Sequence, residues 1–319
     1  MPTETKRRVA ANVALLASFQ SGKGSVVANF SAARNLWASP VMQDLGLLET
    51  NPRWMTTRAF DSATSYIRKT RKPFGRFRSI LTPQTAEFLL RSNWGPASGQ
   101  TFTLATAVSE WLSLVYVEDR TSGADGRALR LTDAWLYRLA FRAAKGDLLR
   151  CEAEWAARRE DVFDLTDPAL TLPAPPMGPA NSSRFAWRQI TLTRDPAGAA
   201  ETFGPQDFEL EIDQGLIHEW TLTSGIDVRK GGKTLVRFRF LLRVNDESWG
   251  LIDRALADTH QAWRIEARNV NSSLRFDFAS VNLAVQDFGT EQKNLKRIGI
   301  EGTAELDSLG NGVTITLVP

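Results

Sequence analysis

Few side chains in this sequence could carry a reaction, and those few lie far apart along the chain. There are two histidines, His218 and His260, and one cysteine, Cys151. The chain has no His-Glu-x-x-His motif, no His or Cys cluster at metal-ligand spacing, no Gly-x-Ser-x-Gly elbow and no phosphate-binding glycine loop. We therefore predict that the protein is not an enzyme, binds no metal and needs no cofactor.

For the remaining candidate residues, a structural role is a simpler interpretation than a chemical one. Cys151 falls on the apolar face of a predicted strand, which indicates a buried thiol rather than a nucleophile. His218 stands two residues before Trp220 and fits a face residue of a strand. The spaced acids Asp161, Asp164 and Asp167 could hold a cation, but acids ahead of a proline-rich segment are more often simply solvated.

Alternating charge is the chemistry that the sequence does offer. Acidic and apolar residues alternate from 207 to 213, which predicts a strand with one wet and one buried face. The acids are Asp207, Glu209, Glu211 and Asp213. Residues 236–243 alternate in the same way, with Arg237, Arg239 and Arg243 on the wet face. If the two strands pair, each acid–arginine contact contributes roughly 0.2–1 kcal/mol. Gly225 and the basic turn Lys230-Gly231-Gly232-Lys233 are predicted to let the chain reverse between them.

Two basic segments are predicted to contact other molecules. The segment Tyr66–Arg78 holds six Lys and Arg with aromatic residues between them. Such a segment could bind nucleic acid phosphates and stack on bases, or form an exposed loop that meets an acidic protein surface, which we favour. The predicted subunit contacts are Arg68, Lys69, Arg71, Lys72, Arg229, Lys230 and Lys233, with the acids at 207–213 as the opposing surface.

Charge is divided unevenly between the halves of the 319-residue chain. Residues 1–160 carry 23 Lys and Arg against 14 Asp and Glu, for a net charge of +9, whereas residues 161–319 carry a net charge of −6. This asymmetry suggests self-association or an anionic partner. No apolar run approaches the roughly 18 residues that span a bilayer, so we expect no membrane contact. The basic Lys6-Arg7-Arg8 is read as the start of a strand or short helix.

The predicted elements are mostly strands, with one helix in each half. A hairpin is predicted from Val13–Phe19 and Ser25–Phe30. Thr82 as N-cap and Pro83 at the first position predict a helix that ends near Gly95. The later strands include one in which Trp135, Tyr137, Leu139 and Phe141 share a face. The second helix is predicted at Glu247–Leu256, with an apolar stripe at Trp249, Ile252, Ala255 and Leu256.

Two sequence matches indicate internal duplication. RFRSIL at Arg76–Leu81 matches RFRFLL at Arg237–Leu242, and LRLTDAWLYRL from Leu129 matches LRFDFASVNLAV from Leu274 in the same order. The prediction is a mainly β protein of two tandem β-sandwich or barrel domains, each with one flanking α-helix. The domains are residues 1–160, with an N-terminal arm 1–55, and residues 184–319; a proline-rich linker, 161–183, joins them.

These segments together resemble the tail tube proteins of long-tailed bacteriophages, in the version with the tube domain duplicated. The passage FELEIDQGLIHEWTLTSGIDVRKGGKTLVRFRFLL is similar to the family's strand, basic hairpin and strand that precede its helix. LTPQTAEFLLRSNWG is similar to that helix. The segments ALRLTDAWLYRLAFRAAKGDLLRCEAEW and SLRFDFASVNLAVQDFGTEQKNLKRIGIEGTAEL are similar to the terminal strands. The resemblance covers most of Tyr66–Glu160 and Phe185–Pro319, but not the first 55 residues.

The resemblance implies a structural virion protein assembled in the host cytoplasm into the virion tail. Chains would form trimeric, pseudo-hexameric rings that stack into a hollow tube for DNA. The implied partners are further copies, the tail terminator, tape measure and distal tail proteins, and transient, non-specific double-stranded DNA. The segments Ser65–Phe74 and Asp227–Lys233 would bridge stacked rings. Two alternatives remain open: a two-domain nucleic-acid-binding module, and a non-polymerising tail-completion or baseplate protein of the same fold.

Overall fold

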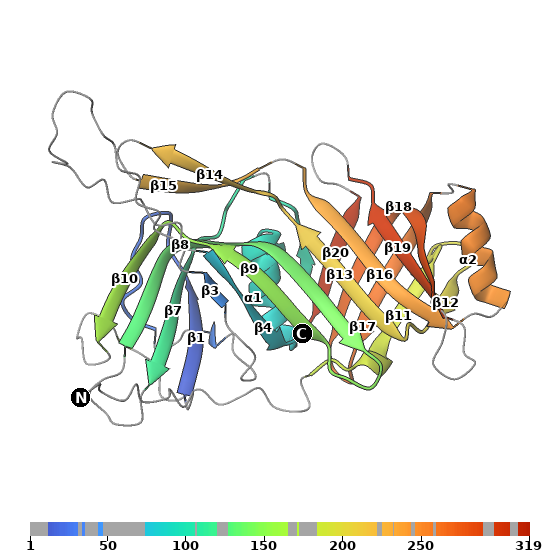
Figure 1. The fold of residues 1–319 in the computed structure, drawn as a ribbon, viewed down its shortest axis with the longest axis horizontal. Coiled ribbons are helices and arrows are strands. Elements are labelled where there is room, and N and C mark those ends of the chain that lie inside the picture. The colour runs from blue at the N-terminus through green and yellow to red at the C-terminus, as the bar shows by residue number, and fades with distance from the viewer. Residues whose placement is uncertain are drawn as a thin grey trace, which may run out of the picture.

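The structure is a computed structural model, and it is mainly β with two α-helices among the residues that it describes. The described residues are 12–30, 34–35, 44–46, 74–105, 107–119, 127–164, 171, 184–221, 225–231, 233–243, 246–257, 260–289, 297–306 and 312–319. Antiparallel pairings link eighteen strands into one network, and two more form a separate hairpin. Figure 1 shows most first-half strands on the left and most second-half strands on the right, with the second-half hairpin β14–β15 above the first half at the upper left.

The first half is built around one long strand, β8. Its elements are β1 (Asn12–Phe19), β2 (Arg34–Asn35), β3 (Asp44–Gly46), β4 (Phe74–Ile80), α1 (Pro83–Asn93), β5 (Ala97–Ser98), β6 (Thr101–Phe102), β7 (Leu112–Asp119), β8 (Arg127–Ala144), β9 (Arg150–Ala156) and β10 (Arg159–Asp164). Strand β8 pairs with β7, β9 and β10; β4 pairs with β3 and β9; and β1 pairs with β2 and β7.

The second half is built around another long strand, β18. After a short 3-10 helix, η2 (Trp187–Gln189), come β11 (Ile190–Arg194), β12 (Glu201–Phe203), β13 (Asp207–Asp213), β14 (Leu216–Thr221), β15 (Gly225–Lys230), β16 (Leu235–Arg243), α2 (Asp246–Leu256), β17 (Gln261–Arg268), β18 (Ser273–Gly289), β19 (Arg297–Ala304) and β20 (Val313–Val318). Strand β18 pairs with β17, β19 and β20; β16 pairs with β13 and β19; and β11 pairs with β12 and β17.

The predicted pairing of the acidic and arginine-rich strands is confirmed. β13 and β16 are antiparallel neighbours, with Glu209 opposite Arg239 and Glu211 opposite Arg237. The predicted turn at residues 230–233 is wrong, because the hairpin β14–β15 lies between the two strands. The chain leaves β13 at Gly215, where φ is 66°, and Gly231 donates back to the Gly215 carbonyl as it returns. A side chain at Gly215 would overlap the Gly231 carbonyl, which explains the glycine at this crossing.

Two other strand predictions are wrong, one in the pairing of β1 and one in the alternation of β8. Residues 25–28 form no strand, and β1 pairs with β7, about a hundred residues later in the chain, rather than with residues 25–30. In β8, a bulge between Leu136 and Arg138 shifts the register against β9. Because a bulge inserts one unpaired residue, it reverses the alternation of the strand. Trp135 and Tyr137 therefore lie in one apolar cluster, whereas Leu139 and Phe141 lie in another.

Both helices form at the positions that the sequence predicts. The Thr82 hydroxyl accepts the Thr85 amide at 3.2 Å, and Pro83 opens α1. The predicted stripe of α2 is only partly right, since Ile252 is buried and Trp249 is 48% exposed. The predicted linker begins too early, because β10 continues to Asp164. Most of the rest of the linker, 165–170 and 172–183, lies outside the described residues.

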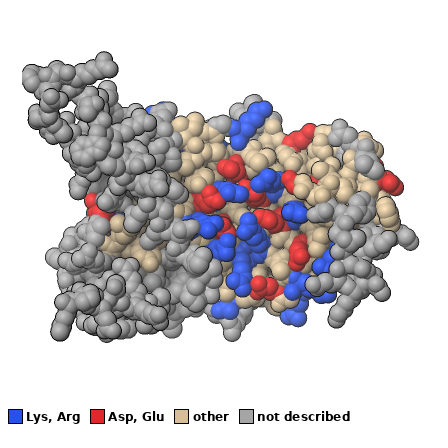
Figure 2. Space-filling view, in the orientation of Figure 1, with Lys and Arg blue, Asp and Glu red and all other residues tan. Residues whose placement is uncertain are grey.

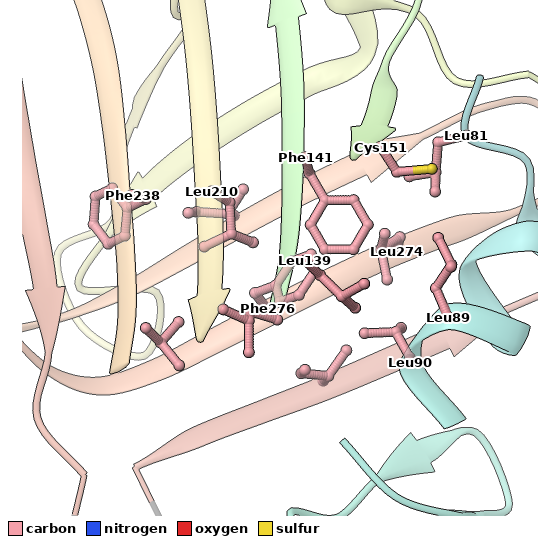
Figure 3. Packing of buried hydrophobic residues seen from close by; sticks show 14 of the residues in the cluster. Leu81, Leu89, Leu90, Leu139, Phe141, Cys151, Leu210, Phe238, Leu274 and Phe276 are labelled. Carbon is pink, nitrogen blue, oxygen red and sulfur yellow. The ribbon is translucent and has the colours of Figure 1, made fainter. Parts of the chain in front are cut away.

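One hydrophobic core runs through both halves. It includes Leu139 and Phe141 of β8, Leu210 of β13 and Phe276 of β18. Figure 3 shows these side chains converging with Leu89 and Leu90 of α1 from the other side. The ring centroids of Phe141 and Phe276, which come from different halves, lie 5.7 Å apart. The two halves therefore stabilise each other through shared burial of apolar surface.

Candidate functional site: a sheet face striped with charge

Six neighbouring strands present arginine and glutamate in alternation on one face of the sheet. In order across the sheet they are β4, β9, β8, β13, β16 and β19. The charges that alternate from strand to strand are Arg76 and Arg78, then Glu152 and Glu154, then Arg138 and Arg142, then Glu209 and Glu211, then Arg237 and Arg239, and finally Glu301. Arg150 of β9, opposite Arg142, and Arg297 of β19, opposite Arg243, depart from this alternation. Figure 2 shows the resulting mixed patch of blue and red at the centre of the molecule. We call this surface the striped face.

The striped face follows from alternation and register together. On each of these strands the residues between the charges are mostly buried, such as Phe77, Ala153, Leu139, Leu210 and Phe238. Charged side chains therefore point away from the core in every strand. The antiparallel pairings then bring opposite signs side by side, and such cross-strand pairs stabilise a sheet.

One chain of ion pairs crosses four strands. Arg78 contacts Glu152 at 2.6 Å, and Glu152 contacts Arg142 of β8 at 3.4 Å. Arg142 then contacts Glu209 of β13 at 2.7 Å. The arginines are about two-fifths exposed. Because exposed ion pairs contribute little each, this chain fixes register more than it adds stability.

A second chain of ion pairs is less exposed and centres on Glu211. Arg138 contacts Glu154 at 2.7 Å and Glu211 at 2.7 Å, and Arg237 contacts Glu211 at 2.8 Å. Glu211 is only 5% exposed. Burial alone would raise its pKa, but the hydrogen bonds from the two arginines outweigh burial and hold the pKa of Glu211 below its ordinary value.

Tyr137, at the bulge of β8, bonds to the same group of charges. Its hydroxyl donates to Glu154 at 2.7 Å. Burial of the ring, together with this bond to a carboxylate, raises the pKa of Tyr137. The neutral hydroxyl therefore stays a donor at physiological pH, and it orients Glu154 toward Arg138.

The acids predicted as a surface for another subunit are largely occupied within the chain. Glu209 and Glu211 bond to arginines, the Asp213 carboxylate accepts the Gly215 amide at 2.8 Å, and the Asp207 carboxylate accepts the Lys145 amide at 3.4 Å. The pairing of β13 with β8 joins the basic half to the acidic half inside one chain. The arginines of β8 and the glutamates of β9 were not predicted as site residues. Residues 150–156 alternate plainly, but the bulge hides the alternation of β8.

The basic residues predicted as contacts divide into three groups. Lys230 ends β15 and donates to the Ala105 carbonyl at 2.7 Å, and burial lowers its pKa. Arg229 and Lys233 are exposed. Arg68, Lys69, Arg71 and Lys72 lie outside the described residues, as does most of the predicted ring-bridging segment Ser65–Phe74. The hairpin β14–β15 itself lies over the first half, where Val228 packs against Trp111 and Trp135.

The described side chains show little that could act on a substrate. Cys151 is buried as predicted, and burial raises the pKa of its thiol to about 12. Within the described ranges, no group of three or more His, Cys, Asp or Glu is placed to hold a metal ion. A hollow in the striped face is lined by two arginines and two acids, so its charge favours neither an anion nor a cation; they are Arg142, Asp207, Glu209 and Arg239. No helix in the described part of the chain has the length and apolar character to cross a membrane.

Comparison of the chain with protein-family models gave no match, and comparison with curated proteins gave none either.

Proposed function

We propose that this chain is a structural protein that assembles into a tail tube of the long-tailed bacteriophage type. In this proposal it is a homo-oligomer of stacked trimeric rings, and DNA passes through the hollow centre of the tube. The observation that carries the proposal is the recurrence of strand pairings in the two halves.

The recurrence covers both helices and all strands except β5, β6, β14 and β15. The pairings of β1 with β2 and β7, of β4 with β3 and β9, and of β8 with β7, β9 and β10 have counterparts in β11, β16 and β18. Each half places its helix directly after the Arg-Phe-Arg strand, β4 or β16. We infer that residues 12–164 and 190–318 are two copies of one domain, as the sequence matches predict. Two copies per chain make a trimer pseudo-hexameric.

The striped face supports a role in contact with DNA that must slide. A surface of arginine alone would bind phosphates tightly, because each neutralised phosphate releases counterions. On the striped face every arginine strand is flanked by a glutamate strand, so the face offers both attraction and repulsion. We therefore assign the striped face to the lumen of the tube, where weak, sequence-independent contact is required.

Size-exclusion chromatography with light scattering, followed by negative-stain microscopy, tests the proposal. The expected result is trimers and multiples of trimers, with rings or tubes that have a central hole. A protein that stays monomeric or dimeric and forms no rings at any concentration contradicts it. Salt-resistant, sequence-selective DNA binding in a mobility assay would instead support the nucleic-acid-binding module. Isolated rings that never stack would support the tail-completion or baseplate protein.

A further inference from the structure

The hairpin β14–β15 belongs to the second half of the chain but lies over the first half (Figure 1). It stands between β13 and β16, which pair with each other, so the chain leaves their sheet and then returns to it. The two passes cross where the Gly231 amide donates to the Gly215 carbonyl at 3.4 Å. A side chain at Gly231 would overlap that of Ile217. This close crossing fixes the direction in which the hairpin leaves the sheet.

One face of the hairpin is buried against the first half. Val228 of β15 is 1% exposed and packs with Trp111 and Trp135, and Leu216 of β14 packs against the same cluster. Successive residues of a strand point to opposite faces, so Ile217 belongs to the outer face, and it is 44% exposed. Burial of apolar surface therefore holds the inner face of the hairpin on the first half.

Two polar contacts add to this packing. The Lys230 ammonium at the end of β15 donates to the Ala105 carbonyl at 2.7 Å. Just before β14, the Gln214 amide donates to the Tyr137 carbonyl at 2.9 Å. Lys230 is half-buried, and burial lowers its pKa. Because a lysine loses hydration when it is buried, such a position needs a hydrogen-bond acceptor, which the first half supplies.

The first half contains an insertion that receives these contacts. Residues 94–111, between α1 and β7, include β5 and β6, whereas only residues 257–260 lie between α2 and β17. The insertion supplies the Ala105 carbonyl and Trp111 to the hairpin. Its strand β6 also pairs with β20 of the second half. Because the second half has no segment of comparable length at this point, these contacts are specific to the junction inside one chain.

We propose that β14–β15 is an internal clasp that holds the two halves of one chain in a fixed orientation, and that it does not bridge stacked rings. The family resemblance implies a bridging role for Asp227–Lys233, which includes the end of β15. A hairpin that reached another ring would have to expose Val228, Trp111 and Trp135, and the hydrophobic effect opposes this. The statement about stacking rests on the proposed function, whereas the clasp can be measured on a single chain.

Hydrogen exchange followed by mass spectrometry tests the clasp on the full-length chain. Val228→Asp places a carboxylate among aromatic side chains, so the amides of β14, β15 and residues 107–111 should exchange at least about tenfold faster. The matched control Ile217→Asp adds the same charge to the outer face and should not speed exchange in either segment. Lys230→Met removes the donor to Ala105 and should speed exchange of the hairpin at least about threefold, which gives a second test if Val228→Asp does not fold.

The clasp is overturned if Lys230→Met and a folded Val228→Asp both exchange like wild type. It is also overturned if Ile217→Asp speeds exchange as much as Val228→Asp, because the effect would then come from any charge on the hairpin. Accelerated exchange in the two inner-face variants alone supports it.

Assembly tests the statement about stacking. Arg229→Glu/Lys233→Glu reverses two exposed charges on the hairpin and beside it. This variant should form rings and stack as wild type does, and residues 107–111 should be as protected in tubes as in the subunit. Rings that no longer stack, or exchange at 107–111 that rises on assembly, would show that the hairpin bridges rings and would leave the ring proposal standing. Wild-type protein that forms no rings overturns the proposed function, and the single-chain exchange test still decides whether the hairpin is a clasp.

Discussion

Glu211 is the residue on which the striped face depends most. It is nearly buried, and it is held by arginines from two different strands, one in each half of the chain. Burying a carboxylate has a large desolvation cost, which its arginine partners offset and which stays uncompensated when a partner is removed. The Arg138–Glu211–Arg237 group therefore couples the folding of the two halves.

The Glu211→Gln substitution should lower the free energy of unfolding by about 1–3 kcal/mol, since it weakens two charge-assisted hydrogen bonds and leaves two arginines side by side. The matched control is Glu209→Gln on the same face of the same strand. Glu209 is 35% exposed and contacts Arg142, so its loss should cost no more than about 1 kcal/mol. Urea denaturation of both variants measures the difference. Equal effects would show that Glu211 has no special role.

The same residue predicts a pH dependence. Its pKa is lowered in the folded chain, so its contribution is fully present above the unfolded-state value of about 4.3 and is lost as pH falls through the folded-state pKa. The stability difference between wild type and Glu211→Gln should be constant above about pH 5 and shrink as the pH falls below the unfolded-state pKa and through the lowered folded-state pKa. A difference that grows on acidification would contradict this sign.

Gly302 of β19 leaves room for a neighbouring aromatic ring because it has no side chain. A Cβ at this position would overlap the ring of Phe238, which packs against Phe240, Trp263 and Phe278. Gly302→Ala should therefore destabilise the fold by about 1–3 kcal/mol through overpacking. Gly250→Ala in α2 is the control, because no described atom beyond its chain neighbours and its own helix backbone lies within 4 Å of an added Cβ, and it should stabilise the helix by up to about 1 kcal/mol. Melting temperatures that move in the same direction for both variants would refute the packing argument.

Among the elements, α1 shows what the local sequence is enough to predict. Its N-cap, first proline and length follow from residues within one turn of its ends, and the prediction is confirmed. The alternation of β13 and β16 was equally visible, and so was their pairing. The bulge in β8 was not predicted, because it breaks the alternation that the prediction relied on. The partner of β1 was not predicted either, because it lies about a hundred residues later in the chain. For the same reason the acids of β13 were foreseen as a surface, while their partners on β8 were missed.

The α1 cap gives a measurable prediction. Thr82→Ala removes the oxygen that accepts the Thr85 amide and should cost about 1 kcal/mol, whereas Thr82→Ser keeps a hydroxyl and should recover most of that loss. Thermal melts followed by far-UV circular dichroism compare the two. If serine is as destabilising as alanine, the effect comes from the lost methyl group and not from the cap.

For the molecule as a whole, the shared core and the β8–β13 junction make the two halves interdependent. We therefore expect a single thermal transition, with equal calorimetric and van't Hoff enthalpies, measured on the monomer at low concentration. Two resolved transitions would mean that the halves fold independently, with the junction adding little.

The variant Arg142→Glu should lower the melting temperature of this transition without dividing it into two. Adding Glu209→Arg should restore part of the lost stability, because it re-forms the ion pair with the charges exchanged.

The junction between β8 and β13 also creates a risk of wrong strand pairing while the chain is being synthesised. The edge of β8 at residues 138–144 leaves the ribosome well before β13 at residues 207–213, which will cover it. At 5–20 residues per second, an intervening stretch of about 70 residues leaves this edge open for roughly 4 to 14 seconds. Trp111 and Trp135 stay uncovered for a longer time, because Val228 of β15, which packs against them, is synthesised later than β13. On polysomes that carry many copies, nascent first halves present the same open edge to one another, so premature pairing between unfinished chains competes with the fold until β13 emerges.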